Sequence, residues 1–294
     1  MALPSSGTIT LAQIQTEFGG SNPVRLSEYY RGGAYVTPNN TNVPTGGAIT
    51  LSNFYGAVKQ FAFTIGTTYS STQDLRTLAL AAGWNGSDPV VATISSGVII
   101  SSSSTASAAL TIAGSFPAGV SLVNNGSIVG MGGGGANADS VGIAGGAAVA
   151  VSTAVSITNN GTFAGGGGGG GAGISWGWNG LNRSTPGSGG GSGLTQAPAP
   201  GPLYPGTSVG GQPSQYNSGT GMYSTPGASQ NWGYGGRVSS YGGAGGTWGT
   251  QGQQGGNIDG LPGGGYLGGA GGSAVTGNSN VTWIATGTRY GSLS

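Results

Sequence analysis

Glycine dominates one part of the chain, which contains GMGGGGA at 130–136, GGGGGGG at 165–171, GSGGGSG at 187–193 and a glycine-rich run from 233 to 272. Glycine loses more backbone freedom on folding than other residues, so such a stretch is either disordered or uses the missing side chain to bring backbones together. A polyproline II helix has about three residues per turn and no internal hydrogen bonds, so glycine-rich chains in this form can bond to one another. We therefore expect a bundle of these helices over 130–275, with the other residues forming loops at the helix ends.

Two other interpretations of this stretch are open. The 68 glycines and 14 prolines are typical of low-complexity chains. Disorder usually also comes with high net charge and few aromatic residues, whereas this chain has a net charge of +1 with 6 Trp, 12 Tyr and 6 Phe. A collagen triple helix requires a strict glycine period with proline in the triplets. Such a period runs from Gly243 to Gly255 but is lost at Ile258, and its triplets contain no proline.

The charge and residue inventory excludes several classes of function. Charged residues make up 4% of the chain, so no basic patch is available to neutralise nucleic-acid phosphates. No apolar run reaches the length of about 18 residues that spans a bilayer. The start at Met1 lacks the basic and apolar regions of a signal peptide. The chain has no cysteine and no histidine, which removes disulfides, thiolate chemistry and imidazole ligands.

The first sixty residues contain a short pattern that occurs three times. An apolar-x-Leu-small-x-apolar motif begins at Ile9, Val24 and Ile49. In the first copy, Thr10 can cap a short helix and Gly19 can end it. Helices this short are not stable alone, so their apolar faces must pack on something. Either this region attaches the chain to a larger assembly, or it caps the core of the same chain.

The following residues have the pattern of short strands. Phe61, Phe63 and Ile65 alternate as a strand does, and a helix is expected after Asp74. Beyond Pro89, β-branched segments are separated by Ser, Gly and Pro, which predicts a β-rich region. A second repeat, VSLVNNGSI at 120–128 and VSITNNGTF at 155–163, has an offset of 35 residues. Asn-Asn-Gly predicts a turn in each copy, and the fixed offset favours a unit used twice, as in a solenoid.

The sequence offers no catalytic constellation and no metal or cofactor site. A catalytic site needs titratable groups placed together, but the only carboxylates after Asp88 are Asp139 and Asp259. The single lysine, Lys59, lies far from both in sequence. The glycine runs are not followed by the Lys-Ser/Thr of a phosphate-binding loop. We therefore expect no enzymatic activity and no cofactor.

The segments between the glycine runs are rich in aromatic, amide and hydroxyl side chains. Similar compositions occur in antibody paratopes, where aromatic side chains give a large contact area at low entropic cost. Amides and hydroxyls suit sugars or protein loops, and aromatic faces suit sugar rings or apolar patches. These segments are therefore a candidate binding surface. Some of the aromatic side chains could instead pack onto the glycine bundle.

Several motifs resemble structural proteins of tailed bacteriophages. The quoted residues are PSSG at 4–7, LSEYYRGG at 26–33, DLR at 74–76, AAGW at 81–84 and GNSNVTW at 277–283. Together with the NNG units, the polyglycine runs and the aromatic loops, they resemble the distal tail-fibre adhesins of T-even-like phages. This resemblance implies a protein at the tip of a virion tail fibre, made in the host cytoplasm, whose variable loops recognise a bacterial surface receptor.

The expected fold class is mostly β and irregular, in four parts. These are an N-terminal attachment module with short helices (1–60), a β-rich shoulder with one short helix (61–129), the glycine-rich polyproline II bundle with aromatic loops (130–275) and a C-terminal strand packing back on the shoulder (276–294). The attachment module is expected to bind other phage tail or fibre proteins, and the loops a host outer-membrane protein or surface polysaccharide. No nucleic-acid partner is expected.

The candidate residues fall into two sets. The attachment residues are Leu11, Ile14, Phe18, Leu26, Tyr29, Tyr30, Leu51, Phe54 and Tyr55. The receptor-binding residues implied by position are Trp176, Trp178, Tyr204, Tyr216, Tyr223, Trp232, Tyr234, Tyr241 and Trp248. The alternatives are a structural minor tail or decoration protein without its own receptor, and an ice-binding protein. Ice binding would require regular Thr or Ala rows, whereas the insertions here are irregular and aromatic.

Overall fold

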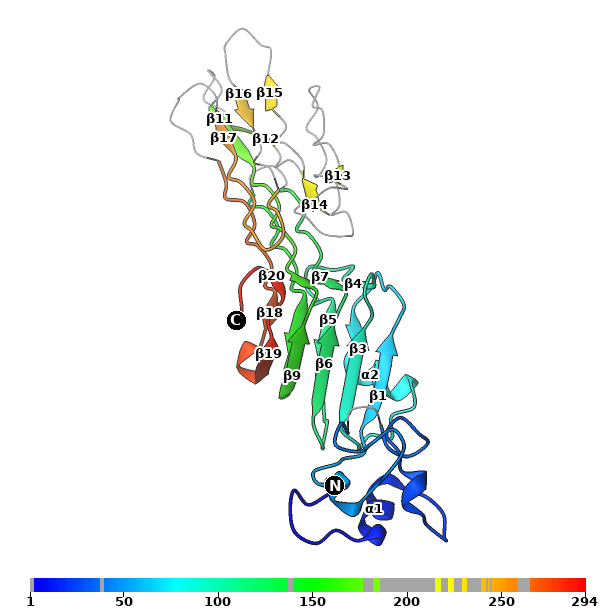
Figure 1. Ribbon diagram of the computed structural model, residues 1–294. Coiled ribbons are helices and arrows are strands. Elements are labelled where there is room, and N and C mark those ends of the chain that lie inside the picture. The colour runs from blue at the N-terminus through cyan, green and yellow to red at the C-terminus, as the bar shows by residue number, and fades with distance from the viewer. Residues whose placement is uncertain are drawn as a thin grey trace.

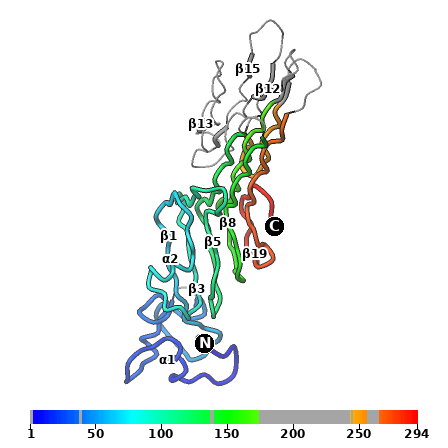
Figure 2. The backbone as a smooth tube through the Cα atoms, turned by 180° about the vertical axis from the view of Figure 1, so that it is seen from behind, coloured from blue at the N-terminus to red at the C-terminus, as the bar shows by residue number. Residues whose placement is uncertain are grey.

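The molecule is elongated, with the N-terminal residues at one end and the glycine segments leading to the other (Figure 1). Seen from behind, the glycine segments leave the middle of the molecule together (Figure 2). The computed structural model describes residues 3–37, 40–136, 140–176, 182–185, 215–217, 222–224, 229–231, 239–241, 243, 245–257 and 265–294.

Residues 1–60, here called the N-terminal module, contain helix α1 (Leu11–Phe18) and the 3-10 turns η1 (Leu26–Glu28) and η2 (Leu51–Phe54). The Thr10 hydroxyl accepts from the backbone N–H of Gln13, and the Gln13 side chain accepts from Thr10 N–H. Thr50 and Asn53 form the same capping box at η2. Because each box satisfies free backbone donors, it fixes where the helical turn begins. The start of α1 at Leu11 and its end before Gly19 confirm the sequence prediction.

Three parallel sheets form the middle of the molecule. The first contains β1 (Phe61–Ile65), β3 (Val90–Ile94), β6 (Val120–Asn124), β9 (Val155–Asn159) and β19 (Val281–Ala285). The second contains β4 (Ile99–Ser101), β7 (Ser127–Val129), β10 (Thr162–Ala164) and β20 (Thr288–Tyr290). The third contains β2 (Gln73–Asp74), β5 (Leu110–Ile112), β8 (Val149–Val151) and β18 (Val275–Thr276).

Successive strands of the chain belong to successive sheets, so the chain winds around a central core. The turn β3–β4–β5 is followed by the turn β6–β7–β8, and each strand pairs in parallel with its equivalent in the next turn. We call these residues, 61–129, 148–164 and 274–294, the solenoid. Helix α2 (Leu75–Ala81) lies between β2 and β3 and is capped by Asp74, whose side chain accepts from the backbone N–H of Thr77.

The 35-residue repeat corresponds to two stacked turns of the solenoid. Ser121 pairs with Ser156 and Leu122 with Ile157, which confirms the predicted unit. Every second side chain of β3, β6 and β9 is buried, and these side chains fill the core. The last turn closes the stack when β19 pairs with β9 and β20 with β10. This return of the C-terminal strand was also predicted.

Asn-Asn-Gly forms a corner between two sheets, and the first asparagine of each copy is fully buried there. Asn124 and Asn159 are 0% and 1% exposed. Asn124 Nδ2 donates to Asn159 Oδ1 at 2.8 Å, and Asn159 Nδ2 donates to the carbonyl of Thr286 at 2.9 Å. The two side chains therefore connect three successive turns of the solenoid.

The glycine segments leave the solenoid at the same corner of two successive turns, between β7 and β8 and between β10 and β18. Six of these segments, which we call the glycine lattice, bond to one another through their backbones: 130–136, 140–147, 165–172, 243–249, 250–255 and 265–272. Donors recur every third residue, as in the bonds from Gly130, Gly133 and Ala136 to segment 165–172.

The run of seven glycines, Gly165–Gly171, is the central segment of the lattice. Gly168 donates to Thr250 at 2.9 Å and accepts from Gly246 at 2.7 Å, while Gly169 donates to Ile143 at 2.8 Å and accepts from Gly269 at 2.7 Å. A Cβ atom built on Gly168 would lie 1.7 Å from the carbonyl oxygen of Gly269. Since neighbouring backbones surround this segment, its positions have no room for a side chain, which accounts for the uninterrupted glycines.

The predicted fold class is wrong. The described residues have two α-helices and three parallel sheets with 13 strands, an α/β-like arrangement. Among these residues, the glycine segments are assigned to no helix of any kind, so the expected polyproline II bundle is replaced by extended segments inserted into a solenoid. The error arose because composition drew attention to the glycines, while the architecture depends on parallel pairing between distant strands.

Short strands occupy the end of the glycine segments farthest from the N-terminal module (Figure 1). β11 (Gly173–Trp176) pairs with β12 (Asn182–Thr185), and β13 (Gln215–Asn217) pairs with β14 (Met222–Ser224). β16 (Ser239–Tyr241) lies between β15 (Ser229–Asn231) and β17 (Gly256–Asn257). All these pairs are antiparallel. We call β11–β17 the distal strands.

Candidate functional site

The predicted receptor-binding residues are distributed over the distal strands and the connections between them. The backbones of Trp176, Tyr216, Tyr223 and Tyr241 lie in β11, β13, β14 and β16, and their side chains are outside the described atoms. Tyr216 and Tyr223 are cross-strand partners. Trp178, Tyr204, Trp232 and Tyr234 lie outside the described residues. The chain thus brings four of these positions to one end of the molecule.

Trp248 occupies a different place. Its ring packs against Tyr290 of β20 with a centroid distance of 5.5 Å, where the glycine lattice joins the solenoid. The next residue, Gly249, has a φ of +66°, and a Cβ atom there would lie 2.2 Å from the backbone nitrogen of Gly291. The structure therefore separates Trp248 from the distal strands and places it in a tight contact between the two parts.

This placement gives a prediction for Trp248→Ala. Removing the indole leaves a gap against Tyr290, so we expect the free energy of unfolding to fall by about 2 kcal/mol. Adsorption to host cells at a temperature where the variant is folded should stay within about twofold of the parent. Thermal unfolding and cell-adsorption measurements check this, with Leu267→Ala, whose side chain is 56% exposed on the lattice, as the control. A large adsorption defect with unchanged stability would return Trp248 to the receptor-binding set.

The predicted attachment residues form the core of the N-terminal module. Ile14, Phe18, Tyr29 and Phe54 are at most 2% exposed, and the rings of Tyr29 and Phe54 meet edge-on at 6.3 Å. These four hold the module together and present no surface to a partner. The accessible members of the set are Leu51, which is 36% exposed, and the half-buried Leu11, Leu26, Tyr30 and Tyr55.

Tyr29 is the module's most constrained ionisable group. Its hydroxyl donates to the carbonyl of Gly19 at 2.7 Å. Burial raises the pKa of Tyr29 above its ordinary value, and the nearby Glu28 and Tyr35 raise it further. The phenol therefore remains protonated and serves as a structural donor.

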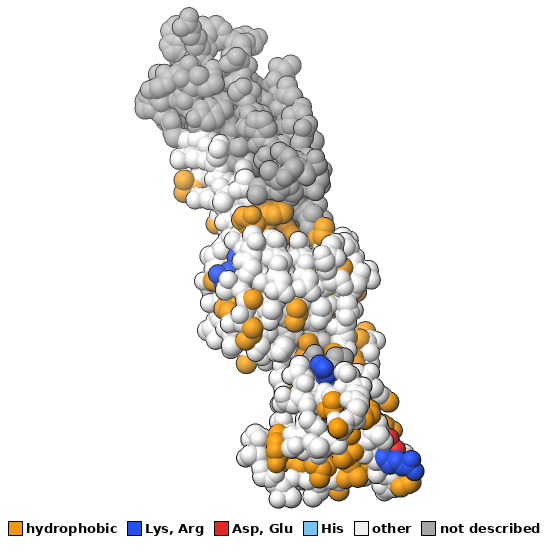
Figure 3. Space-filling model, viewed as in Figure 1, with side chains coloured by type: hydrophobic (Ala, Val, Ile, Leu, Met, Phe, Trp, Pro, Cys, Tyr) orange, Lys and Arg blue, Asp and Glu red, His pale blue; other side chains and the backbone are white. Residues whose placement is uncertain are grey.

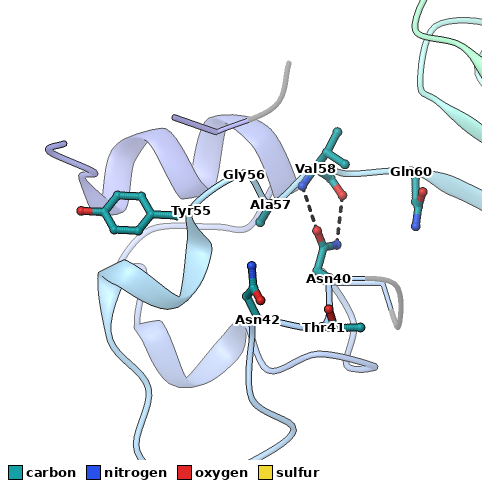
Figure 4. A pocket seen from close by; sticks show the side chains of 8 residues that line it. All are labelled: Asn40, Thr41, Asn42, Tyr55, Gly56, Ala57, Val58 and Gln60. Carbon is teal, nitrogen blue, oxygen red and sulfur yellow. Dashed lines mark hydrogen bonds between the residues drawn. The ribbon is translucent and has the colours of Figure 1, made fainter. Parts of the chain in front are cut away.

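A small open pocket lies where the module meets the solenoid (Figure 4). It has a volume of about 200 Å³. Asn40 forms one wall, because its side chain accepts from Val58 N–H at 2.9 Å and donates to Val58 C=O at 3.0 Å. Asn42 and Gln60 provide neutral amides. The sequence analysis did not single out Asn40, and its place between Pro38-Asn39 and Thr41-Asn42 is typical of a turn.

The chemistry of the described residues is that of contact surfaces. Within the described ranges no group of three or more Asp or Glu side chains could hold a metal ion. Hydrophobic side chains are visible on the N-terminal module at the lower end of the space-filling view (Figure 3). No helix among the described residues is long and apolar enough to cross a membrane.

The comparisons with known proteins agree on one family. Residues 60–294 match the family described as phage tail fibre adhesin Gp38. The chain is also similar to a chain in the crystal structure of the gp37-gp38 adhesin tip complex of the bacteriophage S16 long tail fiber, with a TM-score of 0.50 and 25% identity. That match covers 85% of this chain and 88% of the other. No curated protein matches the sequence. The chain belongs to the family of phage tail fibre adhesins Gp38, and it is a receptor-binding protein of a bacteriophage tail fibre.

Proposed function

We propose that the two ends of this adhesin have separate tasks. The N-terminal module attaches the chain to another tail fibre protein, and the distal strands with their connections bind the host receptor. The observation that supports this division is that the two sets of candidate residues lie at opposite ends of an elongated molecule (Figure 1). The adhesin family covers residues 60–294 and leaves most of the module outside it, as expected for a separate attachment part.

The attachment task is also supported by the structural neighbour. Its description names a complex of gp37 with gp38, so an adhesin of similar fold occurs together with a second fibre protein. For the present chain, we infer a partner among the tail or fibre proteins of the same phage. The half-buried and exposed apolar side chains of the module provide the kind of surface that such a contact requires.

The receptor task is supported by chemistry and by rigidity. The proposed receptor is an outer-membrane protein or a surface polysaccharide of the host. The connections between distal strands supply aromatic rings together with Ser, Asn and Gln, which suit either class. Beneath them, the glycine lattice is tied by backbone bonds between six segments, so it can hold the strands in place. Pre-organisation of this kind lowers the entropic cost of binding.

Loop exchange tests this division. Replacing residues 177–181 and 232–238 with Gly-Ser linkers of equal length removes three candidate aromatic side chains. We expect adsorption to host cells to fall about 30-fold or more, because loss of interface aromatics commonly costs 2 kcal/mol or more. Incorporation of the variant into virions should be unchanged. A chain without residues 1–59 should show the opposite pattern, with normal cell binding by the free protein and no incorporation. Unchanged adsorption after both loop exchanges would contradict the receptor task.

A further inference from the structure

We propose that the N-terminal module is a single-chain mimic of a trimer, which docks on the threefold end of a homotrimeric partner through Leu11, Leu26 and Leu51. This inference rests on the attachment task proposed above and adds the symmetry of the partner and the contact residues. The observation behind it is the sequence motif that occurs three times in the module.

The three copies have equivalent roles in the core. Each copy has its leucine as the first residue of a helical turn, in α1, η1 and η2. Three positions later in each copy comes a side chain that is 0% exposed, and these are Ile14, Tyr29 and Phe54. All three belong to one cluster at the centre of the module. The copies therefore surround a shared core.

The hydrogen bonds between the copies form a closed ring. The residue after each buried side chain reaches the position four residues before the leucine of another copy. Gln15 of the first copy donates to Asn22, before Leu26, at 3.3 Å. Tyr30 of the second copy donates to the carbonyl of Gly47, before Leu51. Tyr55 of the third copy donates to the carbonyl of Gly7, before Leu11.

Backbone bonds repeat the relation for two of the three steps. The N–H of Gly56 donates to the carbonyl of Pro4, and the N–H of Arg31 donates to the carbonyl of Pro44, both at 3.0 Å. In each bond the donor lies five residues after one leucine and the acceptor seven residues before the next. First to second, second to third and third back to first is the connectivity of a ring with threefold pseudosymmetry.

This symmetry determines where the leucines lie. Positions related by a threefold axis have equal distances from the axis and the same height along it. Leu11, Leu26 and Leu51 therefore form a triangle on one end of the module. Leu51 is 36% exposed, and the other two are half-buried. Each is followed by an exposed small residue, Ala12, Ser27 or Ser52, which allows a partner surface to approach closely.

A threefold end of a homotrimer is the partner that matches this surface. A homotrimer presents three identical patches around its axis, and one adhesin chain can satisfy all three at once only if it carries three equivalent contacts. Three linked contacts also raise the overall affinity, because the second and third form within an already bound complex. The stoichiometry follows as one adhesin chain for three partner chains.

Binding to tail fibres isolated from phage particles made without this chain tests the proposal. The full-length chain and the variants Leu11→Ser, Leu26→Ser and Leu51→Ser are compared by surface-immobilised binding, and the complex is weighed by native mass spectrometry. We expect each single substitution to weaken binding by a similar factor of about tenfold, with a mass of one chain bound to three identical partner chains. The matched control is Leu80→Ser on α2, which is 43% exposed and remote from the motif.

The outcomes separate this inference from the proposed attachment task. Circular dichroism and the melting temperature of each variant show whether the module remains folded, and Leu51→Ser, the most exposed of the three, is the variant least able to act through folding. A loss at one leucine alone, a complex with one or two partner chains, or a complex of two adhesin chains would overturn the threefold docking while leaving the attachment task in place. Full binding by a chain without residues 1–59 would overturn both.

Discussion

Gly168→Ala is expected to unfold the glycine lattice, and it has the largest effect that we predict. The added methyl group would lie 1.7 Å from the carbonyl oxygen of Gly269. It meets backbone, which cannot rotate away as a side chain can, so several segments must separate to admit it. Overpacking of this kind usually costs about 1–3 kcal/mol and sometimes more. We expect at least the upper end of that range here.

Thermal unfolding and cell adsorption measure this effect. Because the lattice supports the distal strands, adsorption should be lost together with the lattice, while incorporation through the N-terminal module is retained. Gly66→Ala is the matched control, since a Cβ atom there has no atom within 4 Å and the backbone does not have a positive φ. A Gly168→Ala chain as stable as the parent would show that the lattice is loosely packed.

Asn159→Ala is expected to lower the free energy of unfolding by about 3 kcal/mol, because it removes several hydrogen bonds inside the core. The Asn159 side chain accepts from Asn124 at 2.8 Å and from Gly161 N–H at 3.2 Å, and it donates to the carbonyl of Thr286 at 2.9 Å. With alanine, these buried groups lose their partners. A buried polar group without a partner costs about 1–3 kcal/mol.

The neighbouring residue provides the control. Asn160 is exposed and donates to Asn125 at 2.9 Å across the same two turns. Because water can replace that bond, Asn160→Ala should change the free energy of unfolding by about 0.5 kcal/mol or less. Chemical denaturation of the two variants compares adjacent asparagines of the same repeat. Equal effects would mean that burial does not determine the contribution of the asparagine stack.

Local sequence patterns predicted the local structure well. The capping pattern at Thr10 and the acidic start at Asp74 located both helices. Alternation located the strands near Phe61 and Val90. The 35-residue offset predicted a stacked unit, and the pairing of Ser121 with Ser156 confirms it. These features depend on neighbouring residues or on an exact repeat, both of which are visible in a single sequence.

The arrangement of the sheets could not be obtained in this way. Asn-Asn-Gly predicts a turn, but a turn between paired strands and a corner between two sheets have the same local signature. The pairing of Val155 with Val281 joins residues on either side of the whole glycine stretch. In the N-terminal module, the motif identified the apolar set but did not distinguish the buried Phe54 from the exposed Leu51. That difference depends on how the three copies meet.

The order in which the chain is synthesised has a consequence for the last turn of the solenoid. Asn159 bonds to Thr286, which follows 127 positions later, so the buried asparagine lacks a partner until the end of the chain leaves the ribosome. Closing so large a loop is slow and entropically costly. The compact lattice brings residue 274 back near residue 164 and shortens the effective loop. We therefore expect chains that end before residue 281 to expose an unfinished sheet edge and to aggregate, which makes completion of the C-terminus a checkpoint for a functional adhesin.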